Sequence, residues 1–156
     1  MIESPRIADM PEQQAAIIHI ETSRATIQNV MGPGIGEAMA AAKEQGIGPT
    51  GPWFAHHHKI TAETFNFDIC IPVSAPVSAI GRVQAWTRPA SKVVTTIYQG
   101  PYEGLAEAWQ TFMGWIKENG YKTSGDVYEC YLVGPGASDN PEDWRTELSK
   151  PLLSPL

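Results

Sequence analysis

The sequence is poor in the residues that define several classes of protein. It has only two cysteines, Cys70 and Cys130, each in an apolar run, which excludes a disulfide scaffold and predicts two free core thiols. Pairing between them stays open, because the strands that carry them could be neighbours in space. No apolar run approaches the roughly 20 residues that a membrane helix needs, and the N-terminus lacks a signal-peptide pattern. We therefore expect a cytoplasmic protein without a membrane partner.

Basic residues are also scarce. The chain has 11 Lys and Arg against 17 Asp and Glu, a formal net charge of -6, and this sign does not suit a protein that must neutralise phosphates. Direct nucleic-acid binding is therefore not expected. The glycines of MGPGIGEAM (31–39) follow a G-x-G-x-G spacing instead of the dinucleotide pattern, so we expect no nucleotide and no cofactor.

Hydrophobic periodicity predicts the same element order in two halves. In the first half, residues 15–21 and 25–30 are predicted as strands, 37–46 as a helix that ends at Gly46, and 53–60 and 64–73 as two further strands. In the second half, residues 92–100 are a predicted strand, 101–120 an amphipathic helix, and 127–133 and 144–152 two strands. The order in both halves is β-α-β-β, with one extra strand near the start of the first.

The halves can also be aligned residue by residue. Setting Gly51 against Gly125 aligns 52–58 with 126–132 and 64–73 with 143–152. The predicted fold is α+β, a tandem β-α-β-β repeat with pseudo-two-fold symmetry, an antiparallel sheet covered by two helices, and a ligand cleft between the halves. We expect one domain over residues 1–156, with a first half at about 12–75, a linker at about 76–91 and a second half at about 92–153.

Motifs in the second half resemble the gyrase-inhibitor-like (GyrI-like) small-molecule-binding family, which also occurs as the effector-binding domain of AraC-type and MerR-type regulators. The motifs are the GPYEGL turn (100–105), the helix from Trp109 to Trp115, YECYL (128–132) and the run from Pro141 to Pro151. The resemblance implies a tandem β-α-β-β pair around a central cleft. The HHH run and the stretch 74–91 depart from the family pattern.

The resemblance favours a protein that binds a hydrophobic, aromatic or cationic compound. We expect a stand-alone protein that is a monomer or a homodimer. Two β-α-β-β halves leave no room in 156 residues for a helix-turn-helix, so transcription control is not expected. The alternative is a hydrolase, because some stand-alone members open the cyclopropane ring of DNA-alkylating natural products. A protein-interaction module is a third and weaker possibility.

Glu129 is the first candidate site residue. In a strand it shares one face with Tyr131 among apolar and aromatic neighbours, where a carboxylate is costly to bury without a partner. An exposed strand glutamate is the ordinary alternative, but the family places the glutamate of this motif in the cleft. In the hydrolase, Glu129 would activate water. Tyr131 would bind the ligand or polarise its carbonyl, or simply pack in the core.

Aromatic residues supply further candidates. Trp144 stands where the family often has an aromatic residue near the cleft. The alternative is a core anchor, and we favour Trp144 for the site. Trp109, on the predicted helix, is a second ligand-binding candidate. The role of Trp86, in the predicted linker, stays open between a lid over the groove and packing at a sheet edge.

The run His56, His57, His58 raises the question of a metal. A zinc site needs a third or fourth ligand, and His19 and the acids show no recognisable spacing, so no metal is predicted. In the repeat alignment His57 is the counterpart of Tyr131. On that basis His57 is predicted to face the cleft as a ligand-binding or catalytic proton carrier opposite Glu129.

Overall fold

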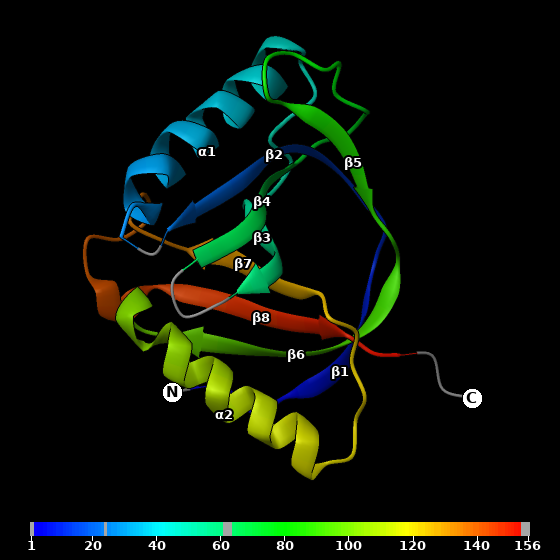
Figure 1. Ribbon diagram of the computed structural model, residues 1–156, viewed down its shortest axis with the longest axis vertical. Coiled ribbons are helices and arrows are strands. Elements are labelled where there is room, and N and C mark those ends of the chain that lie inside the picture. The colour runs from blue at the N-terminus through cyan, green and yellow to red at the C-terminus, as the bar shows by residue number, and fades with distance from the viewer. Residues whose placement is uncertain (1, 24, 61–63, 154–156) are drawn as a thin grey trace. The chain divides into compact units, whose positions relative to one another are not determined.

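The computed structural model describes residues 2–23, 25–60 and 64–153. The chain divides into two compact units. Unit 1 comprises Met1–Met10 and Ser91–Leu156, and unit 2 comprises Pro11–Ala90. Each unit has an antiparallel sheet and one α-helix (Figure 1).

Unit 2 contains β2 (Gln13–Ser23), α1 (Ile27–Glu44), β3 (Phe54–Ile60), β4 (Thr64–Pro72) and β5 (Gln84–Arg88). Its strands pair in the order β3-β4-β2-β5, all antiparallel. The helix α1 packs on β2 and β4. A Cβ atom added to Gly34 would lie 2.6 Å from Cδ1 of Ile69, so the helix approaches the sheet closely at a residue without a side chain.

Unit 1 contains β1 (Arg6–Met10), β6 (Ser91–Gln99), a 3-10 turn (Tyr102–Gly104), α2 (Leu105–Glu118), β7 (Val127–Val133), a second 3-10 turn (Pro141–Asp143) and β8 (Arg145–Pro151). Its strands pair in the order β1-β6-β8-β7. The helix packs through its predicted apolar stripe. A core cluster of buried residues joins α2 to β6 and β8: Val94, Tyr98, Ala108, Phe112, Ile116 and Leu148.

The predicted repeat is confirmed in the hydrogen-bonding register. Ala55 pairs with Ile69 in unit 2 as Glu129 pairs with Leu148 in unit 1, and these are the residues that the sequence alignment matches. Both ladders then shift register one residue beyond the aligned pair His57 and Tyr131. The α+β fold with tandem β-α-β-β repeats is therefore established at the level of strand pairing.

Each repeat is preceded by an edge strand that the sequence did not predict. β1 comes before β2 in the chain but pairs with β6, and β5 comes before β6 but pairs with β2. Both strands are five residues long with the same mostly exposed pattern, so neither has the alternation that identifies a strand from sequence. Trp86 lies on β5, where the sequence predicted a linker.

The prediction for residues 25–30 was wrong. They were expected to form a strand, but α1 begins at Ile27, ten residues before the predicted helix start, and runs through Pro33 and the glycines that follow. Packing overrides weak local propensity here, because Ala38, Ala41 and Ala42 are buried and Gly34 meets Ile69. The predicted stop is close to the observed one, since α1 ends at Glu44 and Gly46 has a φ of 69°.

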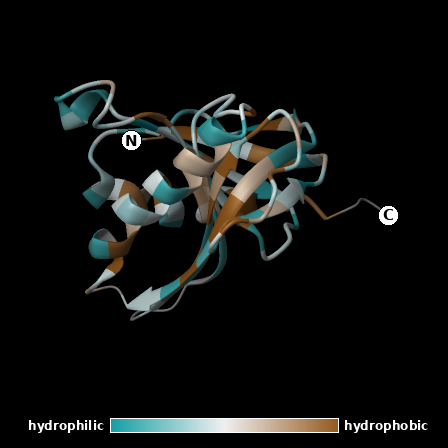
Figure 2. Ribbon diagram, turned by 90° about the horizontal axis from the view of Figure 1, so that it is seen from above, coloured by the Kyte–Doolittle hydropathy of each residue, from teal (hydrophilic) through white to brown (hydrophobic). Residues whose placement is uncertain are grey.

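Polar and apolar residues are arranged as an α+β sheet protein requires. Figure 2 shows hydrophobic and hydrophilic segments alternating along the helix turns and the strands.

Both cysteines are free thiols, as predicted, although only Cys70 is fully buried and Cys130 is half-buried. Neither helix in the described part of the chain has the length and apolarity needed to span a bilayer.

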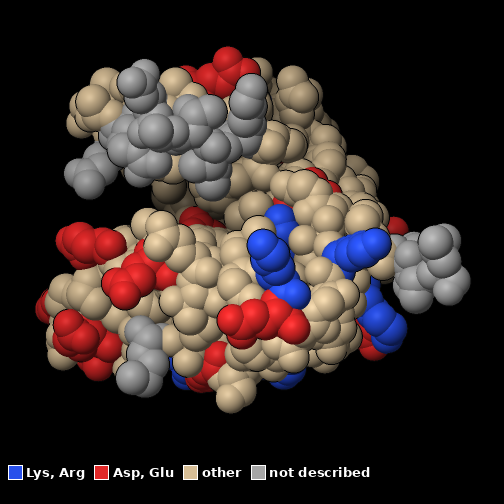
Figure 3. Space-filling view, turned by 60° about the horizontal axis from the view of Figure 1, so that its bottom comes forward, with Lys and Arg blue, Asp and Glu red and all other residues tan. Residues whose placement is uncertain are grey.

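The charged surface is mixed. On the face drawn in Figure 3, most Lys and Arg side chains gather toward the right beside Asp and Glu side chains, and the left carries mostly Asp and Glu. Two ion pairs in unit 1 have this character: Lys92 lies 3.1 Å from Asp9, and Arg145 lies 3.0 Å from Glu3. Exposed pairs of this kind contribute little to stability.

Candidate ligand-binding site

Glu129 lies in the middle of β7 and is only 8% exposed. Its side chain points toward α2. Glu129 Oε2 accepts a hydrogen bond of 2.7 Å from Nε1 of Trp109 on that helix. The exposed-glutamate reading of the sequence therefore does not describe this residue. Burial of an ionised carboxylate requires strong hydrogen bonds.

Tyr131 supplies a second hydrogen bond to the same carboxylate. Its hydroxyl donates to Glu129 Oε1 at 2.7 Å, and the two residues stand two apart on one face of β7. Each carboxylate oxygen thus accepts a short hydrogen bond from a neutral donor. These bonds hold the carboxylate in one orientation, and they come from two candidates that the sequence named.

An aromatic cluster adjoins this hydrogen-bonded group through Tyr131. The ring of Tyr102 lies 5.9 Å from that of Tyr131 and 4.8 Å from that of Trp144, measured between centroids. The Trp144 indole is fixed by a hydrogen bond of 3.0 Å from its Nε1 to the carbonyl oxygen of Ser138. A Cβ atom at Gly134 would lie 3.0 Å from the Tyr102 hydroxyl, so a glycine leaves room for that ring.

The ionisation of the tyrosines reflects the buried acid. Burial, the charge of Glu129 and the hydrogen bond to it raise the pKa of Tyr131 well above its usual value. Burial, and then the charge of Glu129, also raise the pKa of Tyr102. Both phenols therefore stay protonated at neutral pH and act as neutral groups around the carboxylate.

His57 lies in unit 2, at the position that matches Tyr131 in the repeat. It is 6% exposed, and its ring centroid lies 5.2 Å from that of Phe67. Its predicted place opposite Glu129 stays a prediction. Trp86 stacks on His56, with ring centroids 5.2 Å apart, which is a packing role at the β5 edge strand.

Two features of the molecule were missed from the sequence. Tyr102 belongs to the GPYEGL motif, but its aromatic character inside a family turn was not used as a signal for the site. The second feature is a group in unit 2: His19, His58 and Asp68 offer ligand atoms that lie within 4.8 Å of one another. Burial lowers the pKa of His19, but hydrogen bonds and charges from Asp68 and Glu21 raise it by more, so the net shift is upward.

The site residues Trp109, Glu129 and Tyr131 lie within residues 3–153, which match the model of the GyrI-like small molecule binding domain. The chain belongs to the GyrI-like family. No curated protein matches the sequence. The family assignment agrees with the motifs of the second half, and this GyrI-like chain has the α+β fold that they imply.

Solved structures give the same fold. The C-terminal domain of EcmrR superposes with a TM-score of 0.86 at 23% identity, covering 97% of this chain and 98% of that domain. In the EcmrR–DNA complex, the chain spans 58% of the EcmrR chain at 22% identity, with a TM-score of 0.86. SAV2435 bound to tetraphenylphosphonium has a TM-score of 0.71 at 13% identity, covering 97% of this chain and 95% of that one.

Proposed function

We propose that this GyrI-like chain binds a hydrophobic, aromatic or cationic organic compound at Glu129. The observation that carries the proposal is the state of this carboxylate. It is 8% exposed and accepts hydrogen bonds from two neutral donors, Trp109 and Tyr131. The aromatic cluster of Tyr102, Tyr131 and Trp144 lies beside it.

The physical argument concerns charge. Removing a carboxylate from water costs several kcal/mol, and a bound ligand of the opposite charge offsets part of that cost. An organic cation supplies the opposite charge without the strong hydration of a small ion. Aromatic faces then add about 0.5–2 kcal/mol of cation–π attraction. The arrangement therefore favours a bulky apolar cation over a neutral or anionic compound of the same shape.

The first probe follows from a relative. SAV2435 was solved with tetraphenylphosphonium bound, and this ion combines a delocalised positive charge with aromatic faces. Tetraphenylborate has nearly the same shape and the opposite charge, and triphenylphosphine oxide is neutral. A titration of the chain with the three compounds by calorimetry separates the effect of charge from that of apolar area. We expect binding of the cation and none of the anion.

The matching variant is Glu129→Gln. It should weaken binding of tetraphenylphosphonium at least ten-fold, which corresponds to about 1.4 kcal/mol. The control is Glu147→Gln, the same change on β8, at a residue that pairs with Cys130. Equal binding of the cation and the anion, or equal loss in both variants, would contradict a role for Glu129 as the charge partner.

Unit 1 also contains an open pocket of about 370 Å³ whose described lining does not include Glu129. It is lined by Ile2, Tyr98, Gly104, Glu107, Ala108 and Thr111. A bulky side chain introduced by Thr111→Trp would fill part of it. Binding that survives Thr111→Trp and fails in Glu129→Gln supports the proposed site. The reverse result places the ligand in this pocket.

The second candidate function is hydrolysis of a strained ring, and it rests on the same carboxylate. A structure described as a hydrolase from Listeria innocua matches with a TM-score of 0.61 at 14% identity, covering 96% of this chain and 91% of that one. In this reaction Glu129 takes a proton from water as the oxygen attacks a cyclopropane carbon. The ring bond breaks, and its electron pair passes to the conjugated carbonyl, whose oxygen is protonated. Tyr131 or His57 would polarise that carbonyl.

Mass spectrometry distinguishes the two functions. A cyclopropane-bearing alkylator is incubated with the wild type, Glu129→Gln and Tyr131→Phe. A product heavier by one water that forms with the wild type and not with Glu129→Gln establishes hydrolysis. Recovery of the intact compound together with saturable binding establishes a binding protein instead.

A further inference from the structure

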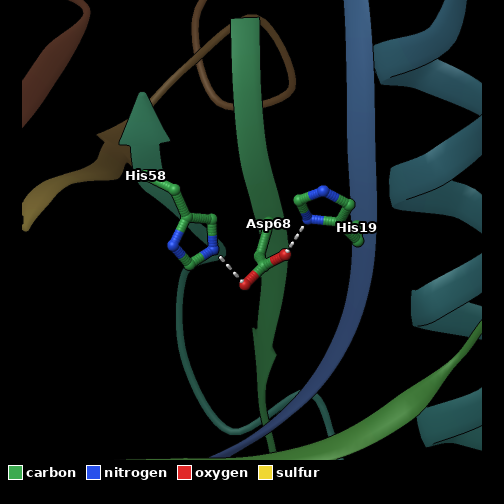
Figure 4. Close-up of side chains that lie close together, drawn as sticks. All are labelled: His19, His58 and Asp68. Carbon is green, nitrogen blue, oxygen red and sulfur yellow. Dashed lines mark hydrogen bonds and ion pairs between the residues drawn. The ribbon is translucent and has the colours of Figure 1, made fainter. Parts of the chain in front are cut away.

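We propose that His19, His58 and Asp68 of unit 2 bind a divalent transition-metal ion such as Zn²⁺. Figure 4 shows the Asp68 carboxylate between the two imidazoles. His19 Nδ1 lies 2.8 Å from Asp68 Oδ1, and His58 Nε2 lies 2.8 Å from Asp68 Oδ2. The three ligand atoms all lie within 4.8 Å of one another.

This spacing is close to what one ion requires. Zinc binds imidazole nitrogen and carboxylate oxygen at about 2.0–2.2 Å, so tetrahedral ligand atoms stand about 3.3 Å apart. Coordination of one ion requires the two 2.8 Å contacts to lengthen to about this distance. Two histidines and one carboxylate leave a further coordination position for water.

Three neighbouring strands bring the ligands together. His19 on β2 and His56 on β3 both pair directly with Asp68 on β4. The register of β3 shifts between His57 and Lys59, and this bulge re-aims His58 so that it reaches the same carboxylate. The residues are 10 and 49 positions from Asp68 in the sequence, which is why no motif spacing identifies them.

The surrounding residues support metal binding. Nε2 of His19, the nitrogen that faces away from Asp68, lies 3.3 Å from Glu21 Oε1. A histidine that binds a metal through one nitrogen commonly donates its other N–H to a carboxylate, which fixes the ring and raises its basicity. The ring centroid of His56 lies 4.3 Å from that of His58, and the His56 ring stacks on Trp86.

The two histidines of the site are accessible to solvent, and the Asp68 carboxylate is buried. The side chains of His19 and His58 are 49% and 40% exposed, whereas that of Asp68 is 8% exposed. Imidazole and carboxylate together suit Zn²⁺ and its neighbours in the transition series, while Mg²⁺ prefers oxygen ligands alone.

Unit 1 shows that the fold does not need these histidines. In the matching register, Ile97 and Glu147 are paired as His19 and Asp68 are, and Leu132 stands at the bulge where unit 2 has His58. The scaffold forms with isoleucine and leucine at these positions. The two histidines therefore add a chemical property to unit 2 beyond what the strand pairing requires.

The test uses the whole chain without an affinity tag. Zn²⁺ binding is measured by calorimetry, and Co²⁺ binding by its visible absorption bands, which report nitrogen and oxygen ligands directly. We expect one ion per chain, and no comparable binding of Mg²⁺. The double variant His19→Ile, His58→Leu copies the residues of unit 1 and should weaken Zn²⁺ binding at least 100-fold while keeping the fold. Asp68→Asn should weaken it at least ten-fold.

The matched control is Glu147→Gln, the register counterpart of Asp68, which should bind Zn²⁺ as the wild type does. Circular dichroism checks that every variant is folded. The proposal is overturned if the folded wild type binds neither Zn²⁺ nor Co²⁺, if it prefers Mg²⁺, or if the double variant binds Zn²⁺ with unchanged affinity.

Discussion

The two units share one strand register, but each carries its buried acid differently with respect to its own helix, on the helix side in unit 1 and on the other side of its sheet in unit 2. In unit 1, Glu129 points to the helix, where it meets Trp109. In unit 2, Ile69 meets Gly34 of the helix, so its neighbour Asp68 points to the other face, where two histidines bind it. The repeat determines where side chains can meet, and single residue differences determine the chemistry at each place.

The strongest way to break this comparison is to put the acid of unit 1 into unit 2. Ala55 is the register counterpart of Glu129 and is 0% exposed. Ala55→Glu should lower the free energy of unfolding by about 3–5 kcal/mol, the cost of a buried charge without prepared donors. Urea denaturation followed by circular dichroism measures the change.

The control for that variant is Ala85→Glu, the same change at an exposed alanine on β5, which should stay within about 0.5 kcal/mol of the wild type. If Ala55→Glu were tolerated as well as Ala85→Glu, the donors around Glu129 would not be what makes its burial possible.

A smaller effect is expected from removing one donor at a time. Tyr131→Phe and Trp109→Phe should each lower the free energy of unfolding by about 1–3 kcal/mol, because each leaves a buried carboxylate oxygen with one fewer donor. In a Glu129→Gln background the loss should shrink, since an amide needs less compensation. The control is Trp115→Phe on the same helix, where the Trp115 ring stacks on Tyr121. Its effect on the free energy of unfolding should be the same with Glu129 and with Gln at position 129.

Alkaline pH sharpens the comparison further. The folded-state pKa of Tyr131 is raised by burial and by Glu129, so the unfolded chain loses this proton first as the pH rises. The stabilisation is complete below the unfolded value of about 10 and is lost above it, at up to about 1.4 kcal/mol per pH unit. Denaturation at pH 8 and at pH 10.5 should show a steeper loss for the wild type than for Tyr131→Phe. Parallel losses would argue against a buried Tyr131–Glu129 pair.

The smallest expected effect is the independence of the two sites. His19→Ile with His58→Leu should change the affinity for tetraphenylphosphonium less than two-fold, and Glu129→Gln should change Zn²⁺ affinity by as little. Calorimetry on both variants with both ligands measures four affinities. A large crossed effect would mean that the two units do not act separately.

Much of the fold was predictable, because it depends on local pattern. The amphipathic stripe around Phe112 identified α2, and the alternation of residues 127–133 identified β7 with its paired face of Glu129 and Tyr131. The register match between Ala55 and Glu129 followed from aligning two glycines. These signals are local, and packing reinforced them.

Other elements were not predictable for equally specific reasons. The start of α1 carries β-branched residues and glycines, and the segment is helical in the structure, where Ala38, Ala41 and Ala42 are buried and Gly34 lies against Ile69. β1 and β5 are short and mostly exposed, and each pairs with the repeat that it does not precede in the chain. This crossed pairing depends on contacts between segments far apart in the chain, and the local sequence pattern does not record them.

The sequence by itself determined the repeated β-α-β-β order, the family and the face of β7 that carries Glu129. The reason is that the hydrophobic periods of strands and helices extend over a few neighbouring residues. Only the tertiary structure decided that Trp109 and Tyr131 both donate to that carboxylate, and that His19, His58 and Asp68 meet. Packing of α2 brings the Trp109 indole to a carboxylate 20 residues away. Strand pairing and a one-residue bulge bring His19 and His58 to Asp68, and local spacing predicts neither meeting.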